Sequence, residues 1–380
     1  MSQPAHNPAE NPGSAGPAKP SPAAPWIRAV VAGLGAAVAV AIVVLAFLWP
    51  TASSSIKDFP LAVAGPSQQV EQFSEQLKER SGVFTVTAVA DRAAAVELLE
   101  TRQAAAAVVL GNPAAGQAPE VISASASSPV SAQLTGQLTA VLNQQMQAQV
   151  LQGIPALQGK PLPQVTTSEV APLAASDTRG TGITAAAFPM VLGGILGGIV
   201  TTLLVRGPWR KLTAIAVYSV TAGALLVWIL EGWFGFLQNN ALVNAAAIAL
   251  ALAATASLVA GCAELLGPPG IALGAVVTMF IANPISSAAA PKEFLPGPWG
   301  AIGQDFVPGA SSTLLRSLSY FPRADTAPQW LVLGLWTAGG AALLLLGLLK
   351  VRGPAPEPVA AAAAPAPAHA PAPAPKHASH

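Results

Sequence analysis

Side chains that could carry out acid–base or nucleophilic chemistry are few in this sequence, and they lie away from its long apolar segments. The histidines are confined to the Pro- and Ala-rich ends, at His6, His369, His377 and His380, and the one cysteine is Cys262. His-based triads, His-Glu-x-x-His zinc sites and cysteine-built metal sites are therefore excluded from the body of the chain. The Gly-x-x-x-x-Gly-Lys-Ser/Thr phosphate loop is also missing. We expect no enzyme activity, no cofactor and no metal. A metal-binding histidine tail is disfavoured against a solvated tail.

Acidic residues are absent from the centres of the apolar segments. Proton- and ion-coupled carriers place carboxylates there, because an intramembrane charge is costly and is kept for function. Glu231 and Glu264 instead lie at segment ends. They are either gating or substrate-contacting groups or ordinary interfacial carboxylates, and the second interpretation is favoured. Ion-driven secondary transport is correspondingly disfavoured.

Apolar residues form 52% of the chain and charged residues 9%, whereas soluble domains carry about 25% charged residues. The apolar residues gather in runs of about 20 residues, the length that crosses a bilayer. The six runs are Ile27–Trp49, Ile183–Val205, Leu212–Leu230, Ala241–Cys262, Gly267–Ser286 and Trp330–Leu349. We predict an α-helical polytopic membrane protein with six transmembrane helices. The net charge of +1 gives no case for nucleic-acid binding.

Clustered cations orient these helices. Arg206, Arg210 and Lys211 lie between the second and third runs, and Lys350 and Arg352 follow the last. Short loops rich in Lys and Arg are typical of the cytoplasmic side. Placing both clusters inside predicts a plasma (inner) membrane protein with both termini in the cytoplasm.

This orientation divides the chain into parts. Residues 1–26 and 351–380 are Pro- and Ala-rich and are predicted to be disordered cytoplasmic tails. Residues 27–49 form the first transmembrane helix, residues 50–182 an extracytoplasmic domain, and residues 183–350 a five-helix membrane domain.

The extracytoplasmic segment alternates between strand and helix patterns. The expected elements are strands at 59–63, 83–89, 105–110 and 121–126 and helices at 67–80, 92–102 and 130–151. Such alternation favours a small α/β domain with a largely parallel sheet. We expect its core to contain Phe59, Leu61, Val63, Val70, Phe73, Leu77, Val86, Leu99 and Val109.

Small residues in the second run indicate close helix packing. Gly193, Gly194, Gly197 and Gly198 bring small residues four positions apart onto one helix, which lets helix backbones approach in lipid. The seam lies either within the protomer or across a dimer.

Residues 287–329, on the outer side, are broken by prolines and rich in apolar side chains. Because backbone at membrane depth must be buried in protein or wetted, we predict two short re-entrant helices that close the outer end of any substrate path. An ordinary solvent loop is the alternative. The residues of this predicted gate are Phe294, Leu295, Pro296, Pro308, Gly309 and Arg316.

Other residues of this segment have more specific expectations. Leu314, Leu315 and Leu318 should face protein or lipid, and Arg316 should meet headgroups or an acidic partner such as Glu293. The predicted interface anchors are Trp299, Tyr320 and Phe321.

The order of these parts resembles the permeases of type-2 ABC exporters, in the phage-infection-protein (Pip)-like branch. The resemblance covers residues 27–350. It is carried by Phe59–Pro66, by Phe188–Gly198 and by the stretch from Phe294-Leu295-Pro296 through Pro308-Gly309-Ala310 to Leu315-Arg316.

The resemblance implies a homodimer or heterodimer of permeases, a separate cytoplasmic ATPase, and a lipid-like or envelope-associated substrate. The ATPase of such exporters contacts the segment before the first helix and the loop between helices two and three, and the loop here contains Arg206, Trp209, Arg210 and Lys211. On the residues alone this loop is equally an orientation signal. Residues 1–25 depart from the family because they contain no amphipathic elbow helix. The alternative is a non-transporting envelope scaffold, receptor or secretion-accessory protein that displays the α/β domain.

Overall fold

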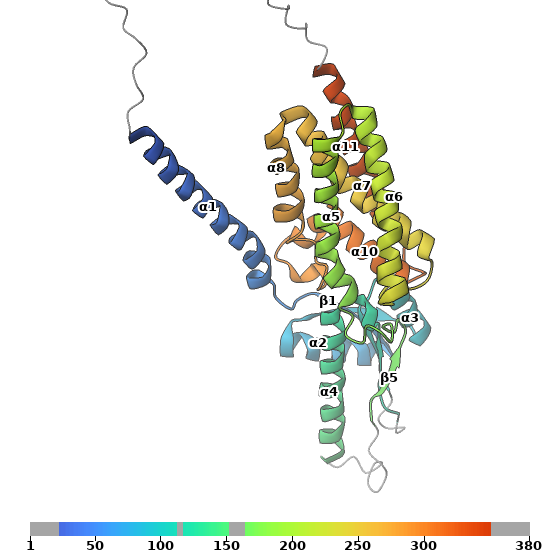
Figure 1. Cartoon of the computed structure of the whole chain (residues 1–380). Helices are drawn as coiled ribbons and strands as arrows, with labels where there is room; N and C mark the ends of the chain where they lie inside the picture. The colour runs from blue at the N-terminus through green and yellow to red at the C-terminus, as the bar shows by residue number, and fades with distance from the viewer. Residues whose placement is uncertain (1–22, 112–116, 152–163, 351–380) are drawn as a thin grey trace, which may run out of the picture.

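The computed structural model describes residues 23–111, 117–151 and 164–350. Within these residues five helices are long and apolar enough to cross a membrane, and an α/β domain lies between the first two (Figure 1). The five are α1 (Ala23–Ser53), α5 (Gly182–Leu204), α6 (Pro208–Val227) continued by the π-helical η4 (Trp228–Trp233), α7 (Ala241–Leu266) and α11 (Ala327–Lys350). The chain is a multi-pass helical membrane protein. The predicted tails lie outside the described residues, except that residues 23–26 begin α1 and are not tail.

The helix predicted over residues 267–286 is shorter than expected. Gly267, with φ +73°, turns the chain after α7, and α8 (Pro268–Val276) continues as the π-helical η5 (Val277–Ala282). These elements together rise about 22 Å at 1.5 Å per residue, less than the roughly 30 Å of bilayer hydrocarbon. Asn283 and Pro284 end the helix, as expected of a residue that precedes proline and of proline itself.

The glycine-rich face of α5 packs within the protomer. A Cβ on Gly194 would lie 2.6 Å from Thr255 Cβ of α7, and one on Gly197 would lie 2.2 Å from the Tyr218 ring of α6. Tyr218 also donates its hydroxyl hydrogen to the Gly193 carbonyl at 2.6 Å. Gly198 meets α7 in the same way, so the predicted packing role of these glycines is confirmed.

Residues 287–329 form short helices, not a solvent loop. They are η6 (Lys292–Phe294), α9 (Trp299–Gln304) and α10 (Val307–Tyr320), and α10 is largely buried against α5, α7 and α11. Its last carbonyls, on Leu318 and Ser319, accept hydrogen bonds from the Asn239 side chain at 2.8 and 2.9 Å. These bonds satisfy groups that a helix end leaves without partners.

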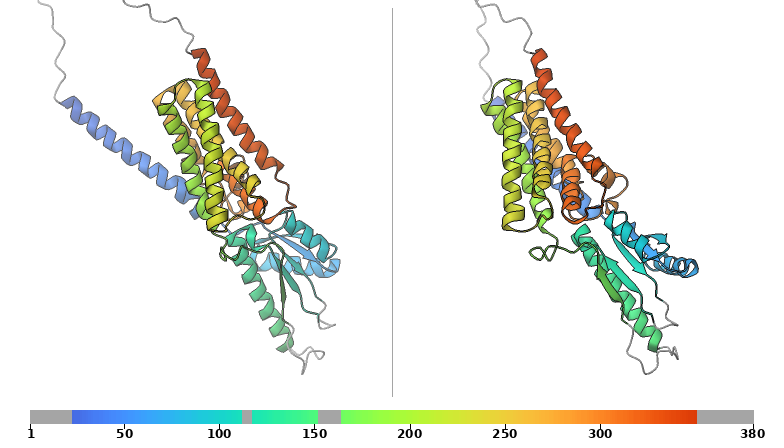
Figure 2. Two further views of the ribbon diagram at one scale, coloured as in Figure 1. Left: turned by 45° about the vertical axis from the view of Figure 1, so that its right-hand side comes forward. Right: turned by 90° about the vertical axis from the view of Figure 1, so that its right-hand side faces the viewer.

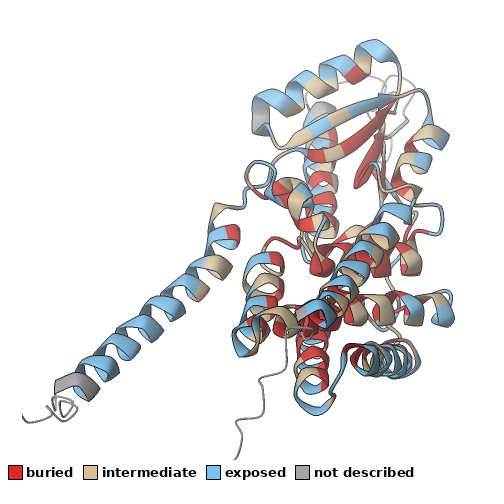
Figure 3. Ribbon diagram, turned by 90° about the horizontal axis from the view of Figure 1, so that it is seen from above, coloured by how far each residue is buried: buried red, intermediate tan, exposed pale blue. Residues whose placement is uncertain are grey.

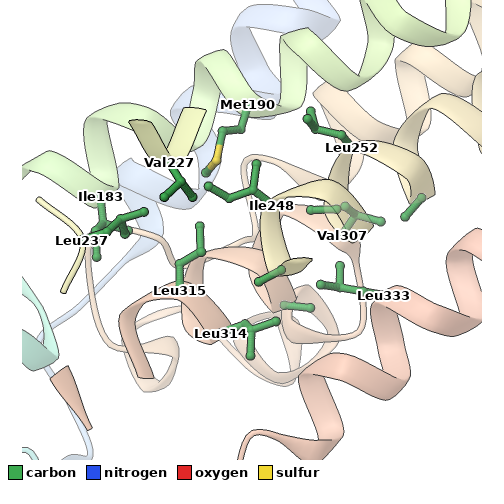
Figure 4. Packing of buried hydrophobic residues seen from close by; sticks show 14 of the residues in the cluster. Ile183, Met190, Val227, Leu237, Ile248, Leu252, Val307, Leu314, Leu315 and Leu333 are labelled. Carbon is green, nitrogen blue, oxygen red and sulfur yellow. The ribbon is translucent and has the colours of Figure 1, made fainter. Parts of the chain in front are cut away.

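The core of the helical part is assembled around α10. Leu314 and Leu315 are at most 1% exposed and pack with Ile248 of α7 and Leu333 of α11 (Figure 4). The half-buried Leu318 borders the same cluster. The expectation that these three leucines face protein or lipid is therefore confirmed, with protein as the neighbour.

Helix α1 stands apart from the other helices. Its side chains are exposed along nearly the whole length, and it diverges from the bundle (Figures 2 and 3). Contacts occur only near its end, where Phe47 meets Phe280 and Trp49 meets Trp299 edge to face. The start of α1 and the end of α11 both lie at the end of the helices opposite the α/β domain (Figure 1).

The α/β domain is built on a five-stranded sheet in the order β2-β1-β3-β4-β5. The strands are β1 (Phe59–Ala64), β2 (Phe84–Val89), β3 (Ala106–Val109), β4 (Glu120–Ser123) and β5 (Thr166–Glu169). Strand β1 is parallel to β2 and β3, with Leu61 opposite Val86 and Ala106, and β4 is antiparallel to β3 but parallel to β5. The expected largely parallel sheet is confirmed. Strand β5 was not predicted.

Helices cover both faces of this sheet. Helices α2 (Ser67–Ser81) and α4 (Pro129–Leu151) pack on one face and α3 (Arg92–Glu100) on the other, with the single turn η2 (Ser125–Ser127) before α4. The predicted core residues are buried at Phe59, Leu61, Val63, Val70 and Leu99 and half-buried at Phe73, Leu77, Val86 and Val109.

Alanine at Gly194 should destabilise the helical part, because its Cβ would overlap Thr255. Overpacking typically costs about 1–3 kcal/mol, so the Gly194→Ala chain should show a lower midpoint of thermal unfolding in detergent. Gly193→Ala is the matched control, since the nearest atoms would be at 3.6 Å, an ordinary contact distance. Equal midpoints for the two variants would contradict the described packing of α5 on α7.

Candidate functional site

The cations predicted to dock an ATPase are not equivalent in the structure. Helix α6 begins at Pro208, so only residues 205–207 connect it to α5. Arg206, Trp209 and Arg210 are exposed, but Lys211 is buried and its Nζ lies 2.5 Å from Glu264 Oε2 of α7. The assignment of Lys211 as a docking cation is therefore wrong: its charge is used to join α6 to α7.

The carboxylates at the segment ends both have neighbours within the bundle. Glu264 pairs with Lys211 as described. Glu231 of η4 accepts a hydrogen bond at 3.1 Å from Asn244, which is fully buried in α7 and also donates to the Gln238 carbonyl at 3.0 Å. Both carboxylates are therefore bonded to side chains of the bundle, and their assignment as ordinary interfacial carboxylates stays a prediction.

The residues of the predicted gate divide between the two parts of the molecule. Phe294 is 4% exposed and packs in the core of the α/β domain beside Phe59. Pro308 and Gly309 begin α10, and a Cβ on Gly309 would lie 2.1 Å from the Gly303 carbonyl oxygen. Of the remaining gate residues, Leu295 is buried and Pro296 half-buried beside Phe294. The gate residues thus lie at the junction of the α/β domain with the helices.

One predicted anchor is misplaced. Phe321 is 2% exposed and belongs to the core of the α/β domain, so it cannot lie in a lipid headgroup layer. Tyr320 is half-buried and donates its hydroxyl hydrogen to the Phe236 carbonyl at 2.8 Å. Trp299 remains exposed, against Trp49.

Arg316 of α10 is buried at this junction, with 4% of its surface exposed. Its guanidinium donates to the carbonyls of Ala126 at 3.0 Å and Ala288 at 3.4 Å and to Thr184 Oγ1 at 3.2 Å. Among the described residues no carboxylate lies within ion-pair distance of it, so the expected pairing with Glu293 is wrong. Three separate segments instead stabilise its charge with neutral hydrogen-bond acceptors.

A second guanidinium, that of Arg102, approaches from the α/β domain. It follows α3 at φ +61°, a left-handed conformation that non-glycine residues seldom adopt. Its Nη1 donates to the Thr313 carbonyl at 3.1 Å and to Ser317 Oγ at 2.7 Å, and the group lies 5.1 Å from the centre of the Phe321 ring. Partial burial, and to a smaller extent the nearby charge of Arg316, lowers the pKa of Arg102 to about 10, while the negative charge of Glu293 acts in the opposite direction.

Both arginines line a cavity of about 440 Å³ between the α/β domain and the helices. Lys292, Glu293 and Asp325 also line it, so its wall carries three cations and two carboxylates. We call it the junction cavity. Buried Ser127 Oγ, Ser287 Oγ and Gln329 Oε1 in its lining have no hydrogen-bond partner among the described residues. Buried polar groups are normally paired, directly or through water, which indicates that this cavity holds polar contents.

A second hollow, of about 340 Å³, lies on the α/β domain between α2, β2 and α4. Apolar side chains dominate its wall, among them Phe73, Leu77, Leu138 and Val141. Helix α4 connects the two sites, since Ser131 lines the junction cavity and Leu134, one turn on, lines the apolar hollow. The polar cavity and the apolar hollow are therefore lined by residues one turn apart on the same helix.

Sequence reasoning identified Arg316 but not Arg102. A cation at the end of a helix is common, because it favours the negative end of the helix dipole. Only the structure shows that this particular cation is half-buried and hydrogen-bonds to Thr313 and Ser317 of α10. The residues Ser311 to Leu314 of α10 are uncharged, so they gave no sign that Arg102 contacts this helix.

The fold and its junction define a class: a multi-pass helical membrane protein whose α/β domain is joined to the helix ends around a cationic cavity. A scan against protein-family models and searches of curated proteins and of solved structures found no match.

Replacing Lys211 by Met should destabilise the helical part, because Glu264 would be left without its counter-charge where its side chain is only 17% exposed. Removing one partner of a buried ion pair typically costs about 3–5 kcal/mol, and the loss is measurable by thermal unfolding in detergent. Arg210→Gln, at the exposed neighbouring position, should change the midpoint little. Replacing Lys211 and Glu264 together by Met should recover most of the loss. An equally destabilised double variant would show that the pair is not the cause.

Proposed function

We propose that this protein is the permease subunit of an ABC-type exporter that moves a lipid-like or envelope-associated substrate. The observation that carries the proposal is the junction cavity, which lies beside an apolar hollow at the end of the membrane helices. A carrier of amphiphiles needs polar and apolar contacts within reach of the bilayer surface. The α/β domain then receives or releases the substrate.

The proposed topology has six crossings, with both termini in the cytoplasm and the α/β domain outside the plasma membrane. Helix α8 with η5 serves as the short sixth crossing. The common location of the start of α1 and the end of α11 supports an even number of crossings (Figure 1). The cations Arg206, Arg210 and Lys350 lie at this same end, which the positive-inside rule assigns to the cytoplasm.

Local irregularities in the helices support a transport role. π-Helical turns inside α-helices are often functional, and they occur here at η4 and η5, both near the junction. Helix α10 crosses the same region and packs on several helices, where it would close the outer end of a substrate path.

Energy would come from a separate ATPase, since the chain has no phosphate loop of its own. Arg206, Trp209 and Arg210 remain exposed and form the proposed docking surface. Helix α1 offers the largest uncovered apolar surface, with Gly33 and Gly35 free of neighbours within 4 Å. We propose that this surface meets lipid and a second permease subunit, identical or related, because small residues favour helix association in membranes.

The scaffold alternative has one observation in its favour. The connection between α5 and α6 is only residues 205–207, and Lys211 is taken up by Glu264. A loop this short presents little surface to an ATPase, so a membrane anchor that displays the α/β domain remains the second candidate function.

Cysteine labelling tests the topology. In a Cys262→Ser background, Thr87→Cys on the exposed surface of β2 should react with an impermeant thiol reagent in intact cells. Trp209→Cys, at the opposite end of the molecule, should react only after the cells are permeabilised. The reverse pattern would overturn the proposed orientation.

Removing the free cations tests coupling. Arg206→Gln with Arg210→Gln should lower the amount of co-purifying ATPase and ATP-driven export together, because docking charges set orientation and association. Lys78→Gln, an exposed cation of α2 at the opposite end of the molecule, is the control and should leave both unchanged. Wild-type behaviour of the double variant, or no ATPase with the native chain, would favour the scaffold.

A further inference from the structure

The junction cavity contains positive charge that the described residues do not neutralise. Every ion pair they form lies elsewhere: Arg92 with Glu120, Lys211 with Glu264, and Arg323 with Glu97 and Glu100. Among the described residues, neither Arg316, which is buried, nor Arg102, which is half-buried, has a carboxylate within 4 Å. Buried charges are normally paired, because desolvation makes an unpaired one costly.

The two guanidiniums are held in place by only some of their N–H donors. Each offers five N–H groups. Arg102 uses only Nη1 for its bonds to Thr313 and Ser317, so its Nε and Nη2 make no hydrogen bond within the described part of the chain. Guanidinium groups of this kind match the geometry of carboxylate and phosphate oxygens.

Neutral groups complete the arrangement. The unpartnered hydroxyls of Ser127 and Ser287 can donate to an oxyanion, and the unpartnered Gln329 Oε1 can accept from a ligand hydroxyl or amine.

We propose that the junction cavity binds a phosphate group of an amphiphilic lipid, with Arg102 and Arg316 on the phosphate oxygens and the acyl chain directed along α4 toward the apolar hollow. A volume of about 440 Å³ accommodates a headgroup, and ligand pockets are commonly about 300–1,000 Å³. The connection from Ser131 to Leu134 favours a lipid over a free anion. The binding stands by itself, and only its assignment as the transported substrate rests on the proposed function.

Native mass spectrometry of the full chain in non-ionic detergent tests this proposal with dioctanoyl phosphatidic acid, dioctanoylglycerol and inorganic phosphate as probes. We expect the phosphatidic acid to bind at least tenfold more tightly than either of the others, because only it has both a phosphate group and acyl chains. Equal binding of dioctanoylglycerol would overturn the phosphate assignment. Equal binding of inorganic phosphate would overturn the lipid assignment.

Arg102→Gln should weaken phosphatidic acid binding about tenfold or more, and Ser287→Ala should weaken it less. The control is Arg92→Gln, which removes an exposed arginine from the other end of α3 and should leave binding unchanged. Unchanged binding by Arg102→Gln, with a wild-type thermal midpoint showing that it folds, would overturn the site.

Failure of the exporter and failure of this site are distinguishable. Binding by the wild-type chain that Arg102→Gln abolishes supports the site whether or not vesicles reconstituted with the ATPase transport lipid. ATP-driven lipid export by a chain that binds no phosphatidic acid would overturn the site and retain the exporter.

Discussion

The buried guanidinium of Arg316 is the constraint around which the junction is arranged. A charge that is 4% exposed must be stabilised by dipoles, and these come from the turn before α4, from α5 and from the segment before η6. Because its three acceptors belong to segments far apart in the chain, satisfying it fixes the α/β domain against the helix ends. Helix α10, which carries Arg316, is also the element around which the apolar core of the helical part is built. One short helix thus connects both halves of the molecule.

The two halves are held together by different physics. In the α/β domain, burial of Phe59, Leu61 and Leu99 removes apolar surface from water, the main driving force of folding in soluble domains. Helices in lipid lack that driving force and rely on close packing, which is why Gly194 and Gly197 meet Thr255 and Tyr218 so closely. Phe294 and Phe321 mark the boundary between the two kinds of packing. Both flank α10 in sequence, yet both are buried in the cores of the α/β domain.

Patterns that repeat along the chain were predictable from the sequence, and contacts between distant segments were not. The long apolar runs, the strand and helix alternation before α5 and the glycine face of α5 are local signals, and the structure contains them. Strand β5 was missed because Thr166–Glu169 has no apolar alternation and is held at the sheet edge by backbone pairing with β4. The short length of α8 and η5 was missed because an apolar run does not reveal where its last turns unwind.

The errors at the site have the same origin. Lys211 resembled a free loop cation because Glu264 lies 53 residues away in sequence, and a partner at that separation is set by helix pairing alone. Phe321 resembled an interface anchor because an aromatic residue beside a proline-broken segment is common at membrane surfaces. Arg102 gave no signal at all, since its partners Thr313 and Ser317 lie 211 and 215 residues away in sequence.

The location of the arginines follows from what a membrane helix can and cannot provide. A regular helix uses its own carbonyls for its hydrogen bonds, so a cation in the middle of a span finds few acceptors and is costly. Broken backbone frees carbonyls, and it is tolerated only where protein or water surrounds it. The segment around Ala288 and the turn at Ala126 are such places, and both supply acceptors to Arg316. The irregular backbone at the junction is therefore what allows Arg316 to be buried there beside the half-buried Arg102, and the remaining donors of the two guanidiniums are what the proposed phosphate site uses.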